Sequence, residues 1–265
     1  MEKTSNNGEK IILMPVIERF AYAKPFRGDD AREICNAVAQ RVSRDFKDAL
    51  KFSAYFKFNE ETGEINGSNL YYCILINDEL RKAGLHLPSV QIGKMLDTKK
   101  KLTNGVYRDY GVAVYDMQNP NSDLAKKLIA EANERGWKTP ILAPFSALRI
   151  PRSSKVSVSF SDDTMGLLTG KEAQEYIQKN FIYMESSGVQ GLARSRYGYW
   201  LAYWGLLADS DEDGRVDWVC GEATRAELEA KIADDIEKEH KRQLDNFVSN
   251  LNKRKNRALE ILRGK

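Results

Sequence analysis

Apolar residues recur at helical spacing in several separate segments of the chain. Residues 30–50 carry one every three or four positions, from Ile34 to Leu50, and Asp30 with Glu33 resembles a capping box. Further helices are predicted at residues 70–82, 89–96, 122–135 and 169–180, the last three beginning at Ser89, Ser122 and Thr169. Glycines at 84 and 136 end two of them.

Strict alternation of side-chain type predicts strands between these helices. Such segments are residues 52–58, 111–115 and 156–160, and in the last of these we expect the serines to line a solvated face. Residues 139–154 contain Pro140, Pro144 and Pro151, which predicts irregular chain or a linker there.

The segment from residue 188 to residue 219 holds three of the four tryptophans. In a strand, successive side chains point to opposite faces. One face would then carry Gly198, Trp200, Ala202 and Trp204, which we expect to be packed. The other would carry Tyr197, Tyr199, Leu201, Tyr203 and Gly205, a composition typical of binding surfaces.

From Thr224 onward the sequence predicts one long amphipathic helix, or two with a break. Acidic residues outnumber basic ones by six to three in residues 225–240, and basic residues outnumber acidic ones by eight to two in residues 241–265. Two interpretations stay open. The helix packs on its own domain, or it mediates homo-oligomerisation, for which the charge distribution suits antiparallel pairing with itself or with a neighbouring helix.

The composition narrows the class of protein. With 265 residues, 42% hydrophobic and 30% charged, the chain is expected to be globular, and its early apolar run, residues 11–17, is too short to span a bilayer. No secretory signal is evident, so synthesis as a cytoplasmic protein is expected. Cys35, Cys73 and Cys220 are predicted to be buried free thiols rather than a disulfide framework or a zinc site. The only histidines are His86 and His240, which argues against hydrolytic chemistry.

Two stretches resemble known families. Residues 77–89, with Met95 and Leu96 beyond, resemble the helix, glycine, Leu-Pro-Ser/Thr, helix unit of C-type-lectin folds of the formylglycine-generating-enzyme type, although residues 90–93 depart from that family's acidic and aromatic pattern. Residues 191–219, with Arg194, Gly198-Tyr199-Trp200 and residues 214–219, are similar to the variable region of the variable proteins of diversity-generating retroelements.

Retroelements of this kind alter template adenines, so an altered asparagine codon can encode Tyr, Ser, Asp, Leu, Gly, Ala or Arg but never Trp or Glu. The resemblance therefore implies a hypervariable surface over about residues 193–213. Its ligand-binding positions would be Ser195, Arg196, Tyr197, Tyr199, Leu201, Tyr203, Gly205, Leu206, Ala208, Asp209, Asp211 and Asp213. Its constant scaffold would be Gly198, Trp200, Ala202, Trp204, Gly214 and Trp218.

Two alternatives remain at this point. Residues 209–217 fit the first nine positions of an acidic calcium loop, but Cys220 stands where the bidentate glutamate belongs, which favours a solvated acidic turn. Residues 70–115 can also be interpreted as a winged helix-turn-helix, in which Lys99, Lys100, Lys101 and Arg108 would contact DNA phosphates, although the net charge is only +3.

The expected architecture is α+β, with a C-type-lectin-like domain at residues 1–222 and a helical tail at residues 223–265. The expected function is non-enzymatic binding of a protein or another macromolecular ligand, without a cofactor or a metal. The alternative is a DNA-binding protein that acts through residues 70–115.

Overall fold

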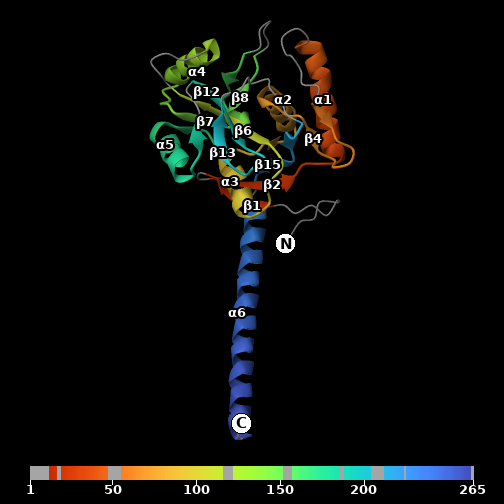
Figure 1. The fold of residues 1–265 in the computed structure, drawn as a ribbon, viewed down its shortest axis with the longest axis vertical. Coiled ribbons are helices and arrows are strands. Elements are labelled where there is room, and N and C mark those ends of the chain that lie inside the picture. Colours follow the sequence, from red (N-terminus) through yellow and green to blue (C-terminus); the bar gives the residue numbers. More distant parts are fainter. Residues whose placement is uncertain are drawn as a thin grey trace. The chain divides into compact units, whose positions relative to one another are not determined.

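A computed structural model describes residues 12–16, 19–46, 55–115, 122–151, 157–184, 188–203, 212–223 and 225–263. The chain forms two compact units, of which the first ends at Glu222 and the second begins at Ala223 (Figure 1). The first unit mixes helices with several small sheets, and the second contains one long helix. The sequence predicted an α+β protein, and the mixture of helices and strands is confirmed.

The helices of the first unit follow the predicted pattern, with corrections at their starts. They are α1 (Asp29–Asp45), α2 (Leu70–Arg81), α3 (Val90–Thr98), α4 (Asp123–Glu134) and α5 (Gly170–Lys179). Side chains of Asn69, Ser89 and Ser122 accept hydrogen bonds from the first turns of α2, α3 and α4. The other two caps were predicted wrongly, because α1 starts after Gly28 and Thr169 makes no side-chain cap bond to α5. Residues 47–50 of the first predicted helix lie outside the described residues.

A four-stranded sheet joins the two ends of the first unit. Its strands, in order, are β1 (Ile12–Val16), β2 (Arg19–Pro25), β15 (Trp218–Glu222) and β5 (Leu85–His86). Because β2 pairs antiparallel with β15, the last strand of the unit is hydrogen-bonded to a strand near the start of the chain. Both ends of the intervening chain are therefore fixed by one sheet.

A six-stranded sheet forms the centre of the unit (Figure 1). Its strands, in order, are β10 (Leu168–Thr169), β7 (Ile141–Ala143), β6 (Arg108–Val114), β12 (Val189–Arg194), β13 (Trp200–Tyr203) and β11 (Tyr183–Met184). All neighbours are antiparallel except β11, which runs parallel to β13 and forms one edge.

Two smaller sheets complete the unit: β14 (Arg215–Val216) with β4 (Ile65–Asn66) and β3 (Lys57–Phe58), and β8 (Leu148–Arg149) with β9 (Ser159–Phe160). Two predictions about this part of the chain were wrong. Residues 139–151 are not an irregular linker, since they contain β7, a short 3₁₀ helix (Phe145–Ala147) and β8. Ser159 is buried rather than solvated. Ser161, just beyond the predicted strand, is also buried, and its Oγ donates to the carbonyl of Ser146 at 2.7 Å.

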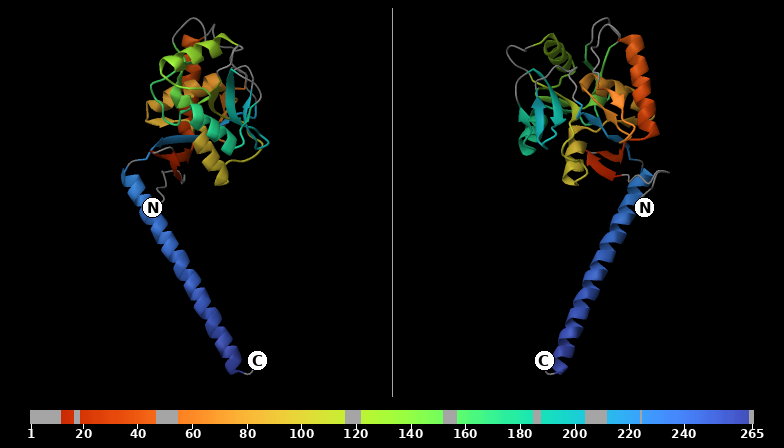
Figure 2. Two further views of the ribbon diagram at one scale, coloured as in Figure 1. Left: turned by 90° about the vertical axis from the view of Figure 1, so that its left-hand side faces the viewer. Right: turned by 45° about the vertical axis from the view of Figure 1, so that its right-hand side comes forward.

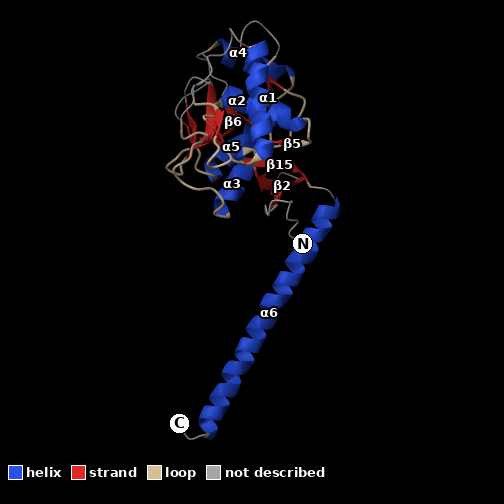
Figure 3. Ribbon diagram, turned by 90° about the vertical axis from the view of Figure 1, so that its right-hand side faces the viewer, coloured by secondary structure: helices blue, strands red, loops and turns tan. Residues whose placement is uncertain are grey.

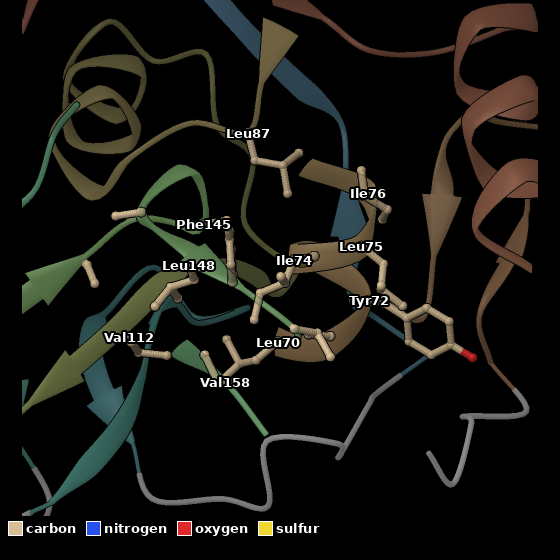
Figure 4. Packing of buried hydrophobic residues seen from close by; sticks show 14 of the residues in the cluster. Leu70, Tyr72, Ile74, Leu75, Ile76, Leu87, Val112, Phe145, Leu148 and Val158 are labelled. Carbon is tan, nitrogen blue, oxygen red and sulfur yellow. The ribbon is translucent and has the colours of Figure 1, made fainter. Parts of the chain in front are cut away.

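The core is divided between two hydrophobic clusters. The first surrounds α2, which has eight of its twelve residues buried and contacts α1, the 3₁₀ helix and β6 (Figures 3 and 4). The second contains α3 and α5, with Trp200, Ala202 and Leu192 from the central sheet. Cys35, Cys73 and Cys220 are buried free cysteines, as the sequence predicts, and burial raises the pKa of Cys35 to about 11.

The second unit contains α6 (Arg225–Leu262), which runs without a break for 38 residues (Figure 2). Of the two forms predicted for the C-terminal region, the single helix is therefore confirmed.

Candidate binding surface

The predicted strand of residues 197–205 is interrupted by a tight turn. Strand β12 ends at Arg194, and β13 begins at Trp200, so Tyr197, Gly198 and Tyr199 belong to the connection. The backbone N–H of Ser195 donates to the carbonyl of Tyr199 at 2.8 Å, and that of Gly198 donates to Ser195 at 2.9 Å. Gly198 has a φ of +88°, which a residue with a side chain rarely adopts. This glycine permits the reversal of direction that simple alternation did not predict.

The tyrosines of the turn are strongly exposed. The exposed fraction is 67% for Tyr197 and 69% for Tyr199. Arg196, also exposed, lies over the Tyr197 ring at 5.0 Å and forms an ion pair with Asp213 at 3.0 Å. The turn thus presents two aromatic rings and a guanidinium group to solvent.

The alternation predicted for the strand itself is correct within β13. Trp200 and Ala202 are buried, whereas Leu201 and Tyr203 on the opposite face are half-buried. The Trp200 ring fits against α3 because Gly93 has no side chain, and a Cβ at that position would lie 2.8 Å from the indole. Trp218, on β15, is also buried. The predicted burial of Trp200 and Trp218 is therefore confirmed.

Tyr203 is positioned by its neighbours rather than freely displayed. Its ring lies against Gly191 of β12, where a Cβ would approach it to 2.7 Å. Its hydroxyl donates a hydrogen bond to Asp109 Oδ1 at 3.2 Å, and its ring meets the Tyr107 ring edge-on at 5.7 Å between centroids. Burial raises the pKa of Asp109 to about 7, although the hydrogen bond from Tyr203 acts in the opposite direction.

The edge strand β11 adds a residue that the sequence did not indicate. Tyr183 pairs with Leu201 in the parallel ladder and is 65% exposed, and Phe181, two residues earlier, is 90% exposed with a φ of +51°. Ile182 between them is buried. The alternation of residues 181–183 was a signal that could have identified this strand.

Two adjacent buried arginines lie at the base of the turn. Arg108 on β6 and Arg194 on β12 are directly paired in the sheet, and both donate to the carbonyl of Thr103, at 3.1 and 3.0 Å. Arg108 is bound by Asp217 through Nε and Nη2, the latter at 2.5 Å. Burial lowers the pKa of Arg108, but its hydrogen bond to Asp217 and the charge of that carboxylate raise it overall.

Arg194 connects this pair to α3 and to Trp200. Its Nη2 lies 3.1 Å from Asp97 Oδ1, and the other oxygen of Asp97 accepts a hydrogen bond from Trp200 Nε1 at 3.0 Å. The same guanidinium donates to Asn104 Oδ1 at 2.9 Å. We call the six residues Asp97, Thr103, Arg108, Arg194, Trp200 and Asp217 the arginine network.

The backbone of the turn is hydrogen-bonded to the loop of residues 103–105, which Arg108 and Arg194 hold in place. The N–H of Gly105 donates to the carbonyl of Arg196 at 2.6 Å, and Asn104 lies so close to Gly198 that a Cβ there would be 3.1 Å from its Oδ1. On the far side, the carbonyl of Asp213 accepts from Tyr107, and the buried Gly214 accepts from Gly67. Hydrogen bonds to the neighbouring loops therefore fix the backbone that carries the exposed side chains.

One residue predicted to bind ligand is buried, and several others lie outside the described residues. Ser195 was predicted to bind ligand, but it is buried, and its Oγ accepts a hydrogen bond from the N–H of Tyr199 at 3.2 Å. Its small polar side chain closes the turn instead. Of the remaining predicted residues, Trp204, Gly205, Leu206, Ala208, Asp209 and Asp211 lie outside the described residues.

The two alternative interpretations find little support in the contacts. The calcium loop would need Asp217, whose carboxylate is engaged by Arg108. The winged-helix interpretation needs an exposed recognition helix and a free Arg108, but Arg108 is 5% exposed and α3 is largely buried. Lys94 of α3 lies over the Trp200 ring at 4.7 Å and donates to Asn180, and burial lowers its pKa to about 8. Lys99, Lys100 and Lys101 are exposed beyond the helix.

Comparisons with known proteins found no match to any family model, any curated protein or any solved structure. Within the described ranges, no helix has the length and apolar character needed to cross a bilayer. Among the same residues, no group of three or more His, Cys, Asp or Glu side chains is arranged to hold a metal ion.

Replacing Asp217 with asparagine should lower the free energy of unfolding by about 3–5 kcal/mol, because the buried charge of Arg108 loses its partner. Asp213→Asn is the control, since it removes the exposed ion pair to Arg196, which should contribute no more than about 1 kcal/mol. Urea denaturation of both variants measures the two changes. Equal losses would mean that the buried pair does not have the structural role described above.

The raised pKa of Asp109 predicts a pH-dependent stability. Between the ordinary pKa of an aspartate, about 4, and about 7, the folded state binds more protons than the unfolded state, so wild-type stability should fall as the pH rises. Asp109→Asn removes this effect. The free energy of unfolding of wild type relative to the variant should therefore be lower at about pH 8 than at about pH 5. A difference that is the same at both pH values would contradict the assignment.

Proposed function

We propose that this chain is a non-enzymatic ligand-binding protein that displays a variable surface on a C-type-lectin-like scaffold. In this proposal a diversity-generating retroelement alters the surface, whose core is Arg196, Tyr197, Tyr199 and Leu201, with Tyr203 beside it. The ligand is a protein or another macromolecule that this surface contacts directly.

The observation that carries the proposal is the division between exposed and buried residues. The residues that an altered adenine codon can encode include the two most exposed side chains of the turn, Tyr197 and Tyr199. The two described tryptophans of this segment, which no such codon encodes, are 7% and 8% exposed. A protein that varies its binding residues needs this separation, because a change in a core residue typically costs several kcal/mol.

The chemistry of the exposed residues supports binding. Tyrosine provides a large, rigid and amphipathic contact surface that loses little conformational entropy, and arginine and tyrosine are enriched among residues that dominate interface energies. Tyr183 extends the aromatic area along β11 next to Leu201. It lies outside the segment proposed to vary and would be a constant contact.

The local structure around the lectin-like motif is compatible with the proposed scaffold. Gly84 has a φ of +70° after α2, and Asn77 Oδ1 accepts a hydrogen bond from the N–H of Leu87 at 2.8 Å. These contacts fix the Leu-Pro-Ser turn that leads into α3, which packs beneath Trp200. His86 is buried with Nδ1 2.8 Å from the carbonyl of Leu87, a structural environment rather than a catalytic one.

Two matched libraries test the proposal without knowledge of the natural ligand. The first randomises residues 196, 197, 199 and 201, and the second randomises residues 195, 198, 200 and 202. After display on yeast, resistance to protease reports folding. We expect most members of the first library and few of the second to remain folded. The first set is exposed apart from the half-buried Leu201, whereas the second contains three buried residues and the positive-φ Gly198.

Folded members of the first library are then sorted with two biotinylated probe proteins, lysozyme and trypsin. Binders with different residues at the four positions should emerge for each probe. If the first library loses folding as often as the second, or yields no binders, this surface is not a variable binding surface.

The retroelement itself is tested in the flanking DNA. The proposal predicts a near-repeat of the coding stretch for residues 193–219 that differs at adenines and lies beside a reverse transcriptase gene. If the flanking DNA holds neither, the diversification mechanism is wrong, while the binding surface is still judged by the libraries.

A further inference from the structure

The long helix α6 carries a stripe of apolar side chains that are exposed in the single chain. The stripe includes Ile236, Leu244, Phe247 and Leu251, and the exposed Ala233 and Ala258 lie at its two ends. Of these, Leu244 is 61% and Phe247 60% exposed. Exposed apolar side chains gathered on one face of a helix indicate an interaction surface.

The spacing of the stripe is the same in both directions along the helix. Its successive positions are 233, 236, 240, 244, 247, 251, 255 and 258, and the steps between them are three, four, four, three, four, four and three residues. At about 100° per residue, these positions remain on one face of the helix. Reversal exchanges Ala233 with Ala258 and Leu244 with Phe247. A stripe of this kind is complementary to an antiparallel copy of itself, as a two-fold symmetric interface requires.

The charges of the helix favour the same arrangement. Residues 225–240 contain six acidic and three basic residues, whereas residues 241–265 contain two acidic and eight basic ones. Two antiparallel copies place the acidic half of one opposite the basic half of the other. A parallel pair would place like charges together, and the repulsion would select against it.

We propose that α6 pairs with α6 of a second copy of this chain in an antiparallel coiled coil, with the two-fold axis between Asp245 and Asn246. His240 and Lys255 are the two polar members of the stripe, opposite Leu251 and Ile236 of the partner. Polar residues at such positions fix the register of a coiled coil at some cost in stability. This inference does not depend on what the first unit binds.

Sedimentation equilibrium of the full chain tests the pairing. The wild type should sediment at twice the chain mass of 30.1 kDa at micromolar concentrations. The double variant Leu244→Asp with Phe247→Asp should be a monomer, because it places charges at the centre of the interface. Lys253→Asp changes the net charge by the same amount on the opposite side of the helix, and it should remain a dimer.

Engineered cysteines test the direction. Residues 233 and 258 are about 38 Å apart within one helix, so they cannot form an intramolecular disulfide. In the antiparallel pair, Ala233→Cys or Ala258→Cys alone should not crosslink under mild oxidation, whereas the variant with both substitutions should form covalent dimers. The wild type, whose own cysteines are buried, is the control.

Three results would overturn the proposal. The first is a monomeric wild type, the second is a Leu244→Asp, Phe247→Asp variant that remains dimeric, and the third is crosslinking by either single-cysteine variant. Circular dichroism of each variant shows that α6 remains helical, so that loss of pairing is not confused with loss of the helix.

Discussion

The candidate surface depends on two positive charges buried side by side in the central sheet. Arg108 and Arg194 occupy paired positions on β6 and β12, and they share the carbonyl of Thr103. Adjacent buried cations repel each other and lose hydration, so each must have its own carboxylate. Asp217, which lies between β14 and β15, and Asp97 of α3 supply these carboxylates. The requirement joins a helix, two connecting segments and strands of the central sheet at one point.

The segment after β12 has two roles, packing in the core and display of side chains to solvent, and this constraint separates them. On the buried side, Trp200 donates a hydrogen bond to Asp97 and packs where Gly93 leaves room for it. On the exposed side are Tyr197 and Tyr199. The backbone that carries them is hydrogen-bonded to Gly105 and within the turn itself. The exposed side chains contribute little to the arginine network. Their identity is therefore free to change, and this freedom is the physical basis of the proposed function.

Local signals in the sequence were sufficient for most helices and for the buried tryptophans. Ser89 and Ser122 are caps that the sequence reveals directly, and alternation correctly divides Trp200 from Leu201. The arginine network could not be predicted, because Asp217 is 109 residues from Arg108 and no local pattern joins them. Without its partner, Arg108 resembled a phosphate contact. Gly198 was assigned to a strand for a similar reason, since the turn depends on the loop that contains Asn104 and Gly105.

Hydrogen exchange of the turn amides tests most directly whether the network, rather than the tyrosines, fixes the backbone. The amides of Gly105, Ser195 and Gly198 each donate to the turn. Replacing both Tyr197 and Tyr199 with serine should leave their protection unchanged, whereas Arg194→Met should reduce it by at least about tenfold, the equivalent of about 1.4 kcal/mol. Loss of protection in the tyrosine variant, with protection retained in Arg194→Met, would contradict the account.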